Sequence, residues 1–164
     1  MYRRILLIGI THLFLAACAS VKTTLYDQDA TRSVKAWTVE FIYESGRTEQ
    51  AFSREKGAET RVIIDGQRRR DLKLRDDLAY LLKDVHKINA SRTKRDGAGA
   101  IRILPMDFSS GGFRSLDVEI VLPNGEIGGR LQIKNGDRNA TFKDDDDFTE
   151  YAAEAIAKAI SGGK

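Results

Sequence analysis

The sequence predicts an α+β fold, a two-layer sandwich in which two helices cover one face of a mostly antiparallel sheet of about four to five strands. Two kinds of apolar pattern predict it. Short stretches between residues 35 and 133 alternate apolar and polar side chains, which is typical of strands with one buried face. Stretches near 72–88 and 147–160 repeat apolar residues every three or four positions, which indicates helices. One-sided elements of both kinds bury their apolar faces together as two layers.

The strongest strand signal is a hairpin over residues 115–134. Pro123-Asn124-Gly125 lies between its strands and supplies the turn, because proline fixes φ and Asn-Gly tolerates positive φ. The pair Gly128-Gly129 predicts a bulge in the return strand. The side chains expected on the buried face are Leu116, Val118, Ile120, Leu122, Ile127, Gly129, Leu131 and Ile133.

Three further strands are predicted from shorter patterns. In residues 35–43, Trp37, Val39, Phe41 and Tyr43 alternate with polar residues. Residues 61–65 form a short branched run that ends at Asp65-Gly66. Residues 100–108 form the third, in which Pro105 suggests a sheet edge or a bulge.

The two predicted helices each have one apolar stripe. The first, at about 72–88, has a stripe of Leu74, Leu78, Leu81, Leu82, Val85 and Ile88. The second begins near Asp147, since Asp147 and Glu150 have the spacing of a capping box, and Gly162 ends it. Its expected buried stripe is Phe148, Tyr151, Ala152, Ala155, Ile156, Ala159 and Ile160.

The amino-terminal residues have the pattern of an export signal. Arg3 and Arg4 precede an apolar run over residues 5–17, which is shorter than the roughly 20 residues that span a bilayer. The run ends in Leu15-Ala16-Ala17-Cys18, with the chain's single cysteine. This order resembles the bacterial lipobox, although His12 departs from the pattern.

The resemblance to bacterial lipoproteins implies cleavage before Cys18, diacylglycerol in thioether linkage to its sulfur and usually a third acyl chain. The membrane would then be a partner through lipidated Cys18. Ala19, where an aspartate would retain such proteins in the inner membrane, implies the outer membrane by the same resemblance. Two alternatives remain, namely an ordinary secretory signal that leaves Cys18 as a free thiol, and a membrane-anchored helix. Either way, one cysteine cannot form an internal disulfide.

The predicted organisation is a signal peptide over residues 1–17, a lipidated tether over 18–33 and one domain over 34–164. The tether is expected because residues 19–33 are polar and lack an apolar period. Cleavage would remove Arg3 and Arg4, which leaves 25 basic against 24 acidic residues and lowers the formal net charge from +3 to +1. Such a balance argues against a nucleic-acid partner, which would require a clustered basic excess.

Candidate catalytic and metal-binding residues are few, and we expect no enzyme, cofactor or metal. His86 is the histidine that remains after cleavage, and its place near a helix end indicates a solvated or capping imidazole. The run Asp144 to Asp147 could hold calcium, but it lacks the alternating spacing of a calcium loop, and acidic residues favour a helix start anyway. A hydrolase with an unrecognised acid pair is the least favoured class.

The basic segment around Arg68, Arg69 and Arg70 leaves two interpretations open. The arginines could contact an acidic surface, such as lipid headgroups or an acidic partner protein, or form a solvated rim beside neutralising aspartates. The order of elements over about 35–160 also resembles proteobacterial envelope lipoproteins, with domains like the amino-terminal domain of the Tol-system translocation protein and the curli-secretion lipoprotein. We therefore expect a non-enzymatic adaptor or assembly accessory with an envelope protein partner. The alternative is a periplasmic binder of a small amphiphile, which would need more apolar hairpin side chains than the core absorbs.

Overall fold

A computed structural model of the chain describes residues 19–41, 71–104, 108–109, 112–113, 115–135 and 145–162. Within them, a mixed sheet of six strands packs one face against helices, so the predicted α+β class is confirmed. The sheet has one strand more than the upper expectation, and three helical segments cover it where two were expected. The strand predicted at 61–65 and the basic residues at 68–70 lie outside the described residues.

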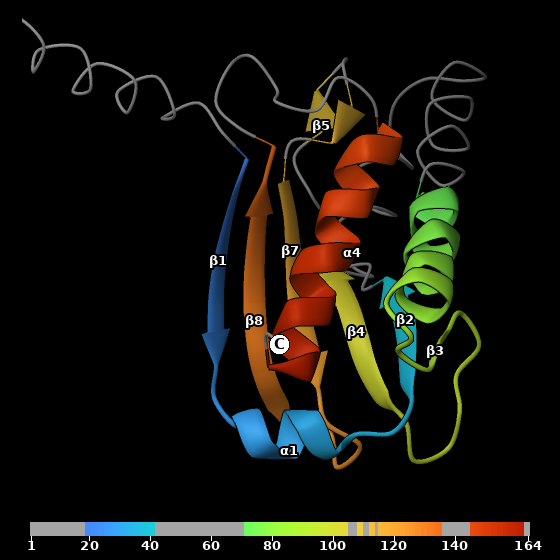
Figure 1. Cartoon of the computed structure of the whole chain (residues 1–164), viewed down its shortest axis with the longest axis vertical. Helices are drawn as coiled ribbons and strands as arrows, with labels where there is room; N and C mark the ends of the chain where they lie inside the picture. The colour runs from blue at the N-terminus through green and yellow to red at the C-terminus, as the bar shows by residue number, and fades with distance from the viewer. Residues whose placement is uncertain are drawn as a thin grey trace, which may run out of the picture.

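The main sheet has the strand order β1-β8-β7-β4-β2-β3. The three pairs on the β1 side are antiparallel, whereas β2 runs parallel to both β4 and β3. A separate two-stranded ribbon lies at one end of this sheet (Figure 1). The main strands are β1 (Ser20–Leu25), β2 (Trp37–Phe41), β3 (Ala90–Ser91), β4 (Gly99–Leu104), β7 (Ser115–Val121) and β8 (Ile127–Lys134), and the ribbon is β5 (Phe108–Ser109) with β6 (Gly112–Phe113).

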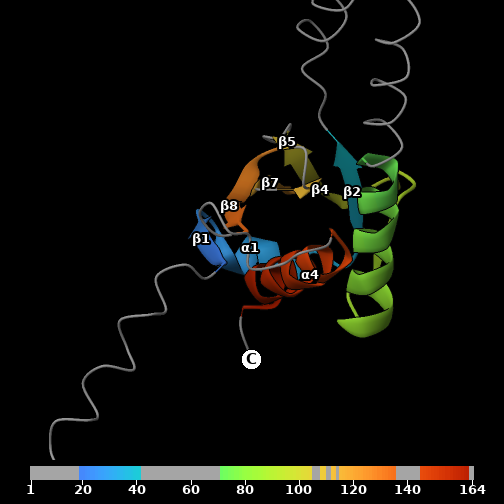
Figure 2. The ribbon, with the colours of Figure 1, turned by 90° about the horizontal axis from the view of Figure 1, so that it is seen from above.

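The helical layer lies against one face of the sheet. Seen from above, the strands from β1 to β2 curve around α4 (Asp145–Ser161), with α1 (Gln28–Ser33) beneath one end (Figure 2). Residues 71–80 form an α-helix that continues into a π-helical turn, η1 (Leu81–Val85), beside β2 and α4. α4 therefore has a neighbour on each side as well as the sheet below.

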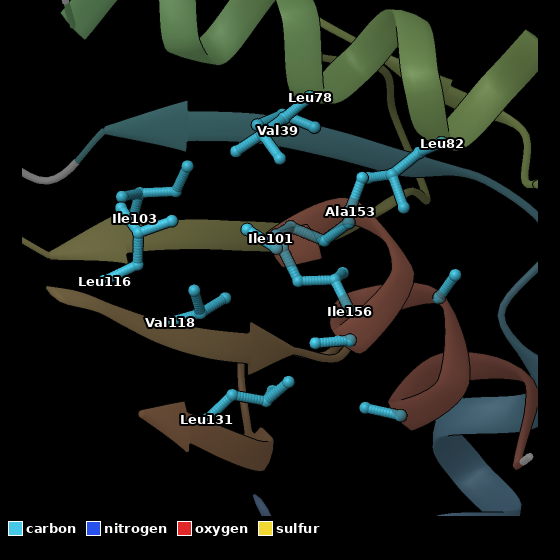
Figure 3. Packing of buried hydrophobic residues seen from close by; sticks show 14 of the residues in the cluster. Val39, Leu78, Leu82, Ile101, Ile103, Leu116, Val118, Leu131, Ala153 and Ile156 are labelled. Atoms are coloured by element: carbon cyan, nitrogen blue, oxygen red, sulfur yellow. The ribbon is translucent and has the colours of Figure 1, made fainter. Parts of the chain in front are cut away.

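The core lies between these layers. Side chains from four adjacent strands meet Leu78 and Leu82 from the first long helix and Ala153 and Ile156 from α4 (Figure 3). Complete burial of a leucine or isoleucine stabilises a fold by roughly 1.5–3 kcal/mol, so this cluster is the main source of stability. Ala153 and Ala157 are buried beyond the predicted stripe, because α4 is covered on two sides and small residues permit close helix packing.

The hairpin prediction is confirmed in register and in turn. Leu116 pairs with Ile133, and Val118 pairs with Leu131. The Gly125 N–H donates to the Leu122 carbonyl at 2.9 Å, and Gly125 adopts a φ of +89°, the left-handed conformation that glycine favours. The turn thus places its positive φ on the glycine alone.

The predicted bulge also occurs, and it corrects one side chain. Ile120 pairs with Gly129 while the next residue, Val121, pairs with Ile127, so Gly128 is the extra residue. The extra residue moves Ile127 off the buried face expected for it, and Ile127 is 37% exposed. A Cβ on Gly129 would lie 2.7 Å from Leu25 Cδ2, so this glycine also permits β1 to pack closely.

The prediction of a tether over residues 18–33 is wrong from Ser20 onward. β1 pairs with β8 along its whole length, from Ser20 opposite Lys134 to Leu25 opposite Gly129. Asp27 then caps α1 by accepting from the Ala30 N–H at 2.8 Å. A polar edge strand and a six-residue capped helix depend on backbone hydrogen bonds, so they leave little apolar pattern in the sequence. The described domain therefore begins at Ser20 and not at residue 34.

Two helix boundaries also differ from the prediction. The first helix ends at Val85, because the His86 N–H donates to the Leu81 carbonyl, five residues back, and Lys87 turns left-handed with a φ of 59°. α4 begins at Asp145, so Asp147 lies inside the helix and the capping box predicted there is wrong. The end at Gly162, with a φ of +78°, is as predicted.

Strand β4 agrees with its predicted alternation, and β2 agrees only in part, because Thr38, expected on its polar face, is buried as well. Trp37 and Val39 are fully buried in β2, and Ile101 and Ile103 are fully buried in β4. β4 lies between β7 and β2, so the edge position suggested by Pro105 is wrong for residues 99–104. Pro105 itself is outside the described residues.

Candidate functional site

The site residues predicted from the amino-terminal and basic segments lie outside the described residues. Cys18 directly precedes the first described residue, Ala19, and Arg68, Arg69 and Arg70 directly precede the helix that starts at residue 71. β1 and that helix begin at the same end of the sheet (Figure 1). The roles assigned to these four residues stay predictions.

The acidic run agrees with the helix-start interpretation as far as it is described. Asp145, Asp146 and Asp147 form the first turn of α4, where carboxylates favour the positive end of the helix dipole. Asp146 pairs with Lys73 of the first long helix, and Lys73 also pairs with Asp77 at 3.0 Å. The hydrogen bonds that the Lys73 ammonium donates to Asp146 and Asp77 raise the pKa of Lys73. The Lys73–Asp146 contact joins the two helices at one end.

Neither a spanning helix nor a metal-ligand cluster occurs in the described part of the chain. No helix there is long and apolar enough to cross a membrane. The same residues contain no group of three or more His, Cys, Asp or Glu side chains arranged to hold a metal ion.

The candidate site is an open groove between η1 and α4, which we call the α4 groove. Its volume is about 430 Å³, and its lining residues are Leu81, Val85, His86, Asp147, Glu150, Tyr151 and Glu154. The π-helical turn creates the η1 wall, because it ends the helix early and leaves Val85 58% exposed. Val85 and Leu81 were both expected in the buried stripe, and Leu81 is only partly buried.

The α4 wall of the groove follows from helix periodicity. Asp147, Glu150, Tyr151 and Glu154 are spaced by three and four residues, so they share one face of the helix. The sequence spacing predicts this acidic face. It does not predict that the end of the first helix lies beside the face, because no local pattern relates the two segments.

The charges along this face are partly paired. The Lys158 ammonium lies 2.6 Å from a Glu154 carboxylate oxygen, and this hydrogen bond lowers the pKa of Glu154, with a smaller contribution from the charge of His86. His86 occupies the carboxyl-terminal cap position of η1, where its backbone N–H donates to the Leu81 carbonyl. The capping role expected of its imidazole stays a prediction. The lining therefore combines the side chains of Leu81, Val85 and Tyr151, which we call the apolar floor, with a rim that carries three carboxylates and one imidazole.

A second groove runs along the other side of α4, between this helix and the edge strand β1. Its volume is about 380 Å³, and it shares Tyr151 and Glu154 with the α4 groove. Its other lining residues are Val21, Thr23, Leu25, Gln28, Ala155, Lys158, Ala159 and Gly162. The outward face of α4 is thus flanked by a groove on each side.

The opposite face of the sheet is different, because its charged side chains pair with one another across strands. Arg102 Nε donates to Glu40 Oε1 at 2.7 Å, and Arg130 Nη2 donates to Glu119 Oε1 at 2.8 Å. Arg102 and Glu119 are themselves opposite each other in the β4–β7 register. The pairing makes this face a self-neutralising surface, whereas the helical side of the domain has the exposed apolar side chain of Val85 in η1.

No family model, curated protein or solved structure matches this chain. The chemistry of the described residues is therefore the basis for a functional assignment. Leucine, valine and tyrosine side chains beside carboxylates form a surface that is chemically complementary to an apolar group flanked by positive charge.

Proposed function

We propose that this chain is a lipoprotein of the Gram-negative cell envelope, whose domain serves as a non-enzymatic adaptor for another envelope protein. The Leu15-Ala16-Ala17-Cys18 motif supports the anchor, and Ala19 supports the outer membrane, facing the periplasm. In the fold, β1 begins at Ser20, two residues after the cysteine that would become the amino terminus.

One observation carries the adaptor role, namely the exposed apolar floor of the α4 groove beside its acidic rim. Val85 is more than half exposed, although it lies one turn from the fully buried Leu82. The rim residues Asp147, Glu150 and Glu154 favour a basic partner. The partner is therefore a protein segment that presents an apolar side chain between lysines or arginines.

The alternative, a binder of a small amphiphile, has less support. It requires apolar hairpin side chains beyond those that the core absorbs. Instead, Leu116, Val118, Leu131 and Ile133 are all buried in the core, and Ile127 alone on the predicted apolar face of the return strand is exposed. The hairpin thus leaves no apolar surplus to line an enclosed ligand cavity.

The anchor is tested by replacing the lipid acceptor. Cys18→Ser should abolish both incorporation of a palmitate analogue and cleavage of the signal, because serine offers no thiol for thioether formation. Alanine in place of serine serves as a second variant. Label retained on either variant would refute the anchor.

The adaptor role is tested by site-specific photo-crosslinking in cells. A photoreactive residue at Val85 should form a discrete protein adduct, whereas the same residue at Gln132, on the opposite face of the sheet, should not. Combined charge reversal, Glu150→Lys with Glu154→Lys, should remove the Val85 adduct if the rim recognises a basic segment. Lipid adducts alone at Val85 would favour the amphiphile binder.

A further inference from the structure

The start of β1 places the predicted anchor at one corner of the domain. Ser20 is the first residue of β1, and Cys18 is two residues earlier in the chain. Two residues span at most about 7 Å, so the lipidated residue cannot lie farther than this from Ser20. β1 is itself held along its length by β8. The anchor therefore joins a rigid sheet through a very short connection.

The residues near this corner define one end of the sheet, which we call the anchored end. Ser20 is opposite Lys134, and Lys134 is opposite Ser115, so these three residues share one level across three strands. The β5–β6 ribbon and the start of α4 lie at the same end (Figure 1). The opposite end of the sheet carries α1, the β7–β8 turn that contains Gly125, and the end of α4. β8 connects the two ends and has eight residues, a length of roughly 25 Å.

We infer that the domain rests on the phospholipid headgroup layer with its anchored end, and that the β7–β8 turn and α1 point away from the membrane. This inference rests on the proposed lipid anchor. In any orientation that keeps the domain out of the hydrocarbon, the short connection holds the anchored end at the surface. The opposite end is connected to the anchor only through the rigid sheet, so on average it lies farther from the membrane surface. A free 15-residue tether, with a root-mean-square length of roughly 20 Å, would impose no such preference.

The orientation does not depend on a charged surface. The described side chains of the anchored end and of the adjoining start of α4 carry both signs, since Lys134 and Lys73 lie there with Asp145, Asp146 and Asp147. A surface of mixed sign is attracted only weakly to anionic lipids. Because a covalent connection sets the orientation, it should persist at high salt, where exposed charges are screened. Both grooves beside α4 run along the side of the upright domain and stay open to a partner.

The inference is tested with a fluorophore at either end of β8. Lys134 and Glu126 are both exposed and adjoin the two ends of this strand, so Lys134→Cys and Glu126→Cys form a matched pair. The chain has one natural cysteine, which the thioether consumes, so each introduced thiol is labelled alone. The mature lipidated variants are reconstituted in phosphatidylethanolamine–phosphatidylglycerol vesicles that carry a headgroup-bound quencher, after flotation has shown that they are membrane-bound.

We expect quenching several-fold stronger at residue 134 than at residue 126, and equally so at low and high salt. Insertion of twelve Gly and Ser residues between Cys18 and Ala19 should reduce this difference, because it lengthens the connection without altering β1. Equal quenching at the two positions without the insertion would overturn the orientation while the anchor stands. Failure of the mature protein to float would overturn the anchor, and the orientation with it.

Discussion

Thr31 packs directly against Gly128, so that a Cβ added to Gly128 would lie only 2.8 Å from Thr31 Oγ1. Thr31 is fully buried, and its hydroxyl donates to the Asp27 carbonyl at 2.6 Å. Gly128, the extra residue of the β8 bulge, is thus the point at which α1 packs on β8. This contact makes the amino-terminal segment a component of the fold.

Removal of residues 19–33 should strongly destabilise the domain. It would delete β1 and α1 and uncover the edge of β8, including the positions of Ile133 and Leu131 that now pair with β1. Loss of a few kcal/mol lowers the melting temperature of a domain of this size by on the order of 10 °C. Thermal unfolding of variants that begin at Ala19 and at Val34 measures the difference. Equal melting temperatures would show that the segment does not pack on the domain in solution.

The single substitution Gly128→Ala tests the same contact without deleting chain. The added methyl would also lie 3.0 Å from Leu122 Cδ2, so α1 or the hairpin must shift. Forcing one extra methyl into a packed site costs about 1–3 kcal/mol. Chemical denaturation measures the loss. Gly97→Ala, in an open loop, is not a suitable control, because the φ of +71° at Gly97 strains any side chain. Ala98→Gly, beside that loop and only partly buried, is the milder comparison.

The two faces of β7 should respond differently to substitution. Ile120 is fully buried, so Ile120→Asp would bury an unpaired carboxylate and cost several kcal/mol or unfold the domain. Glu119 points to the other face, where its side chain is 12% exposed and accepts two hydrogen bonds from Arg130. Glu119→Ala should therefore cost about 1 kcal/mol, which is more than a fully exposed side chain would lose. Similar losses in urea unfolding would contradict the register of β7 and β8.

Leu82 belongs to the core, whereas Val85 lines the α4 groove. Leu82 is fully buried, so Leu82→Ala should cost roughly 2–5 kcal/mol. Val85→Ala should cost less than about 1 kcal/mol, because more than half of the side chain is already in contact with water. Equilibrium unfolding of the two variants gives both values. A large loss at Val85 would place this residue in the core and remove the floor of the proposed binding groove.

Asp76 should make a small contribution to stability that depends on pH. Burial alone would raise the pKa of Asp76, but hydrogen bonds and charge from Arg75 and Arg92 lower it below its ordinary value of 3.8. A lowered folded-state pKa stabilises the fold above pH 3.8, and the contribution disappears as the pH falls through the folded-state value. Because the carboxylate is about one-third exposed, the effect at pH 7 should stay below about 1 kcal/mol.

The substitution Asp76→Asn measures this contribution. The stability difference between wild type and the variant should be constant from pH 7 to about pH 5 and should shrink as the pH falls below 3.8. Added salt should reduce it as well, since both arginines are on the surface. A difference that grows toward low pH would contradict a lowered pKa of Asp76 in the folded state.

The sequence by itself determined the elements whose side chains alternate between core and water. The β7–β8 hairpin follows from period-two burial and from Gly125, which alone supplies the positive φ of its turn. The stripes of Leu74, Leu78 and Leu82 and of Phe148, Ala152 and Ile156 likewise set the buried faces of the two long helices. The resemblance of residues 15–18 to a lipobox, and the near-neutral charge that cleavage before Cys18 would leave, are also properties of sequence alone.

Only the tertiary structure decided the role of residues 20–33 and the place of the α4 groove. β1 is held by hydrogen bonds to β8, and such bonds leave no signature in residue type, so a polar edge strand is indistinguishable from a tether in the sequence. The groove exists because the π-helical turn at Leu81–Val85 ends the first helix beside α4 and directs Val85 outward. Contacts between segments about 65 residues apart determine that junction, and a local apolar period cannot encode them.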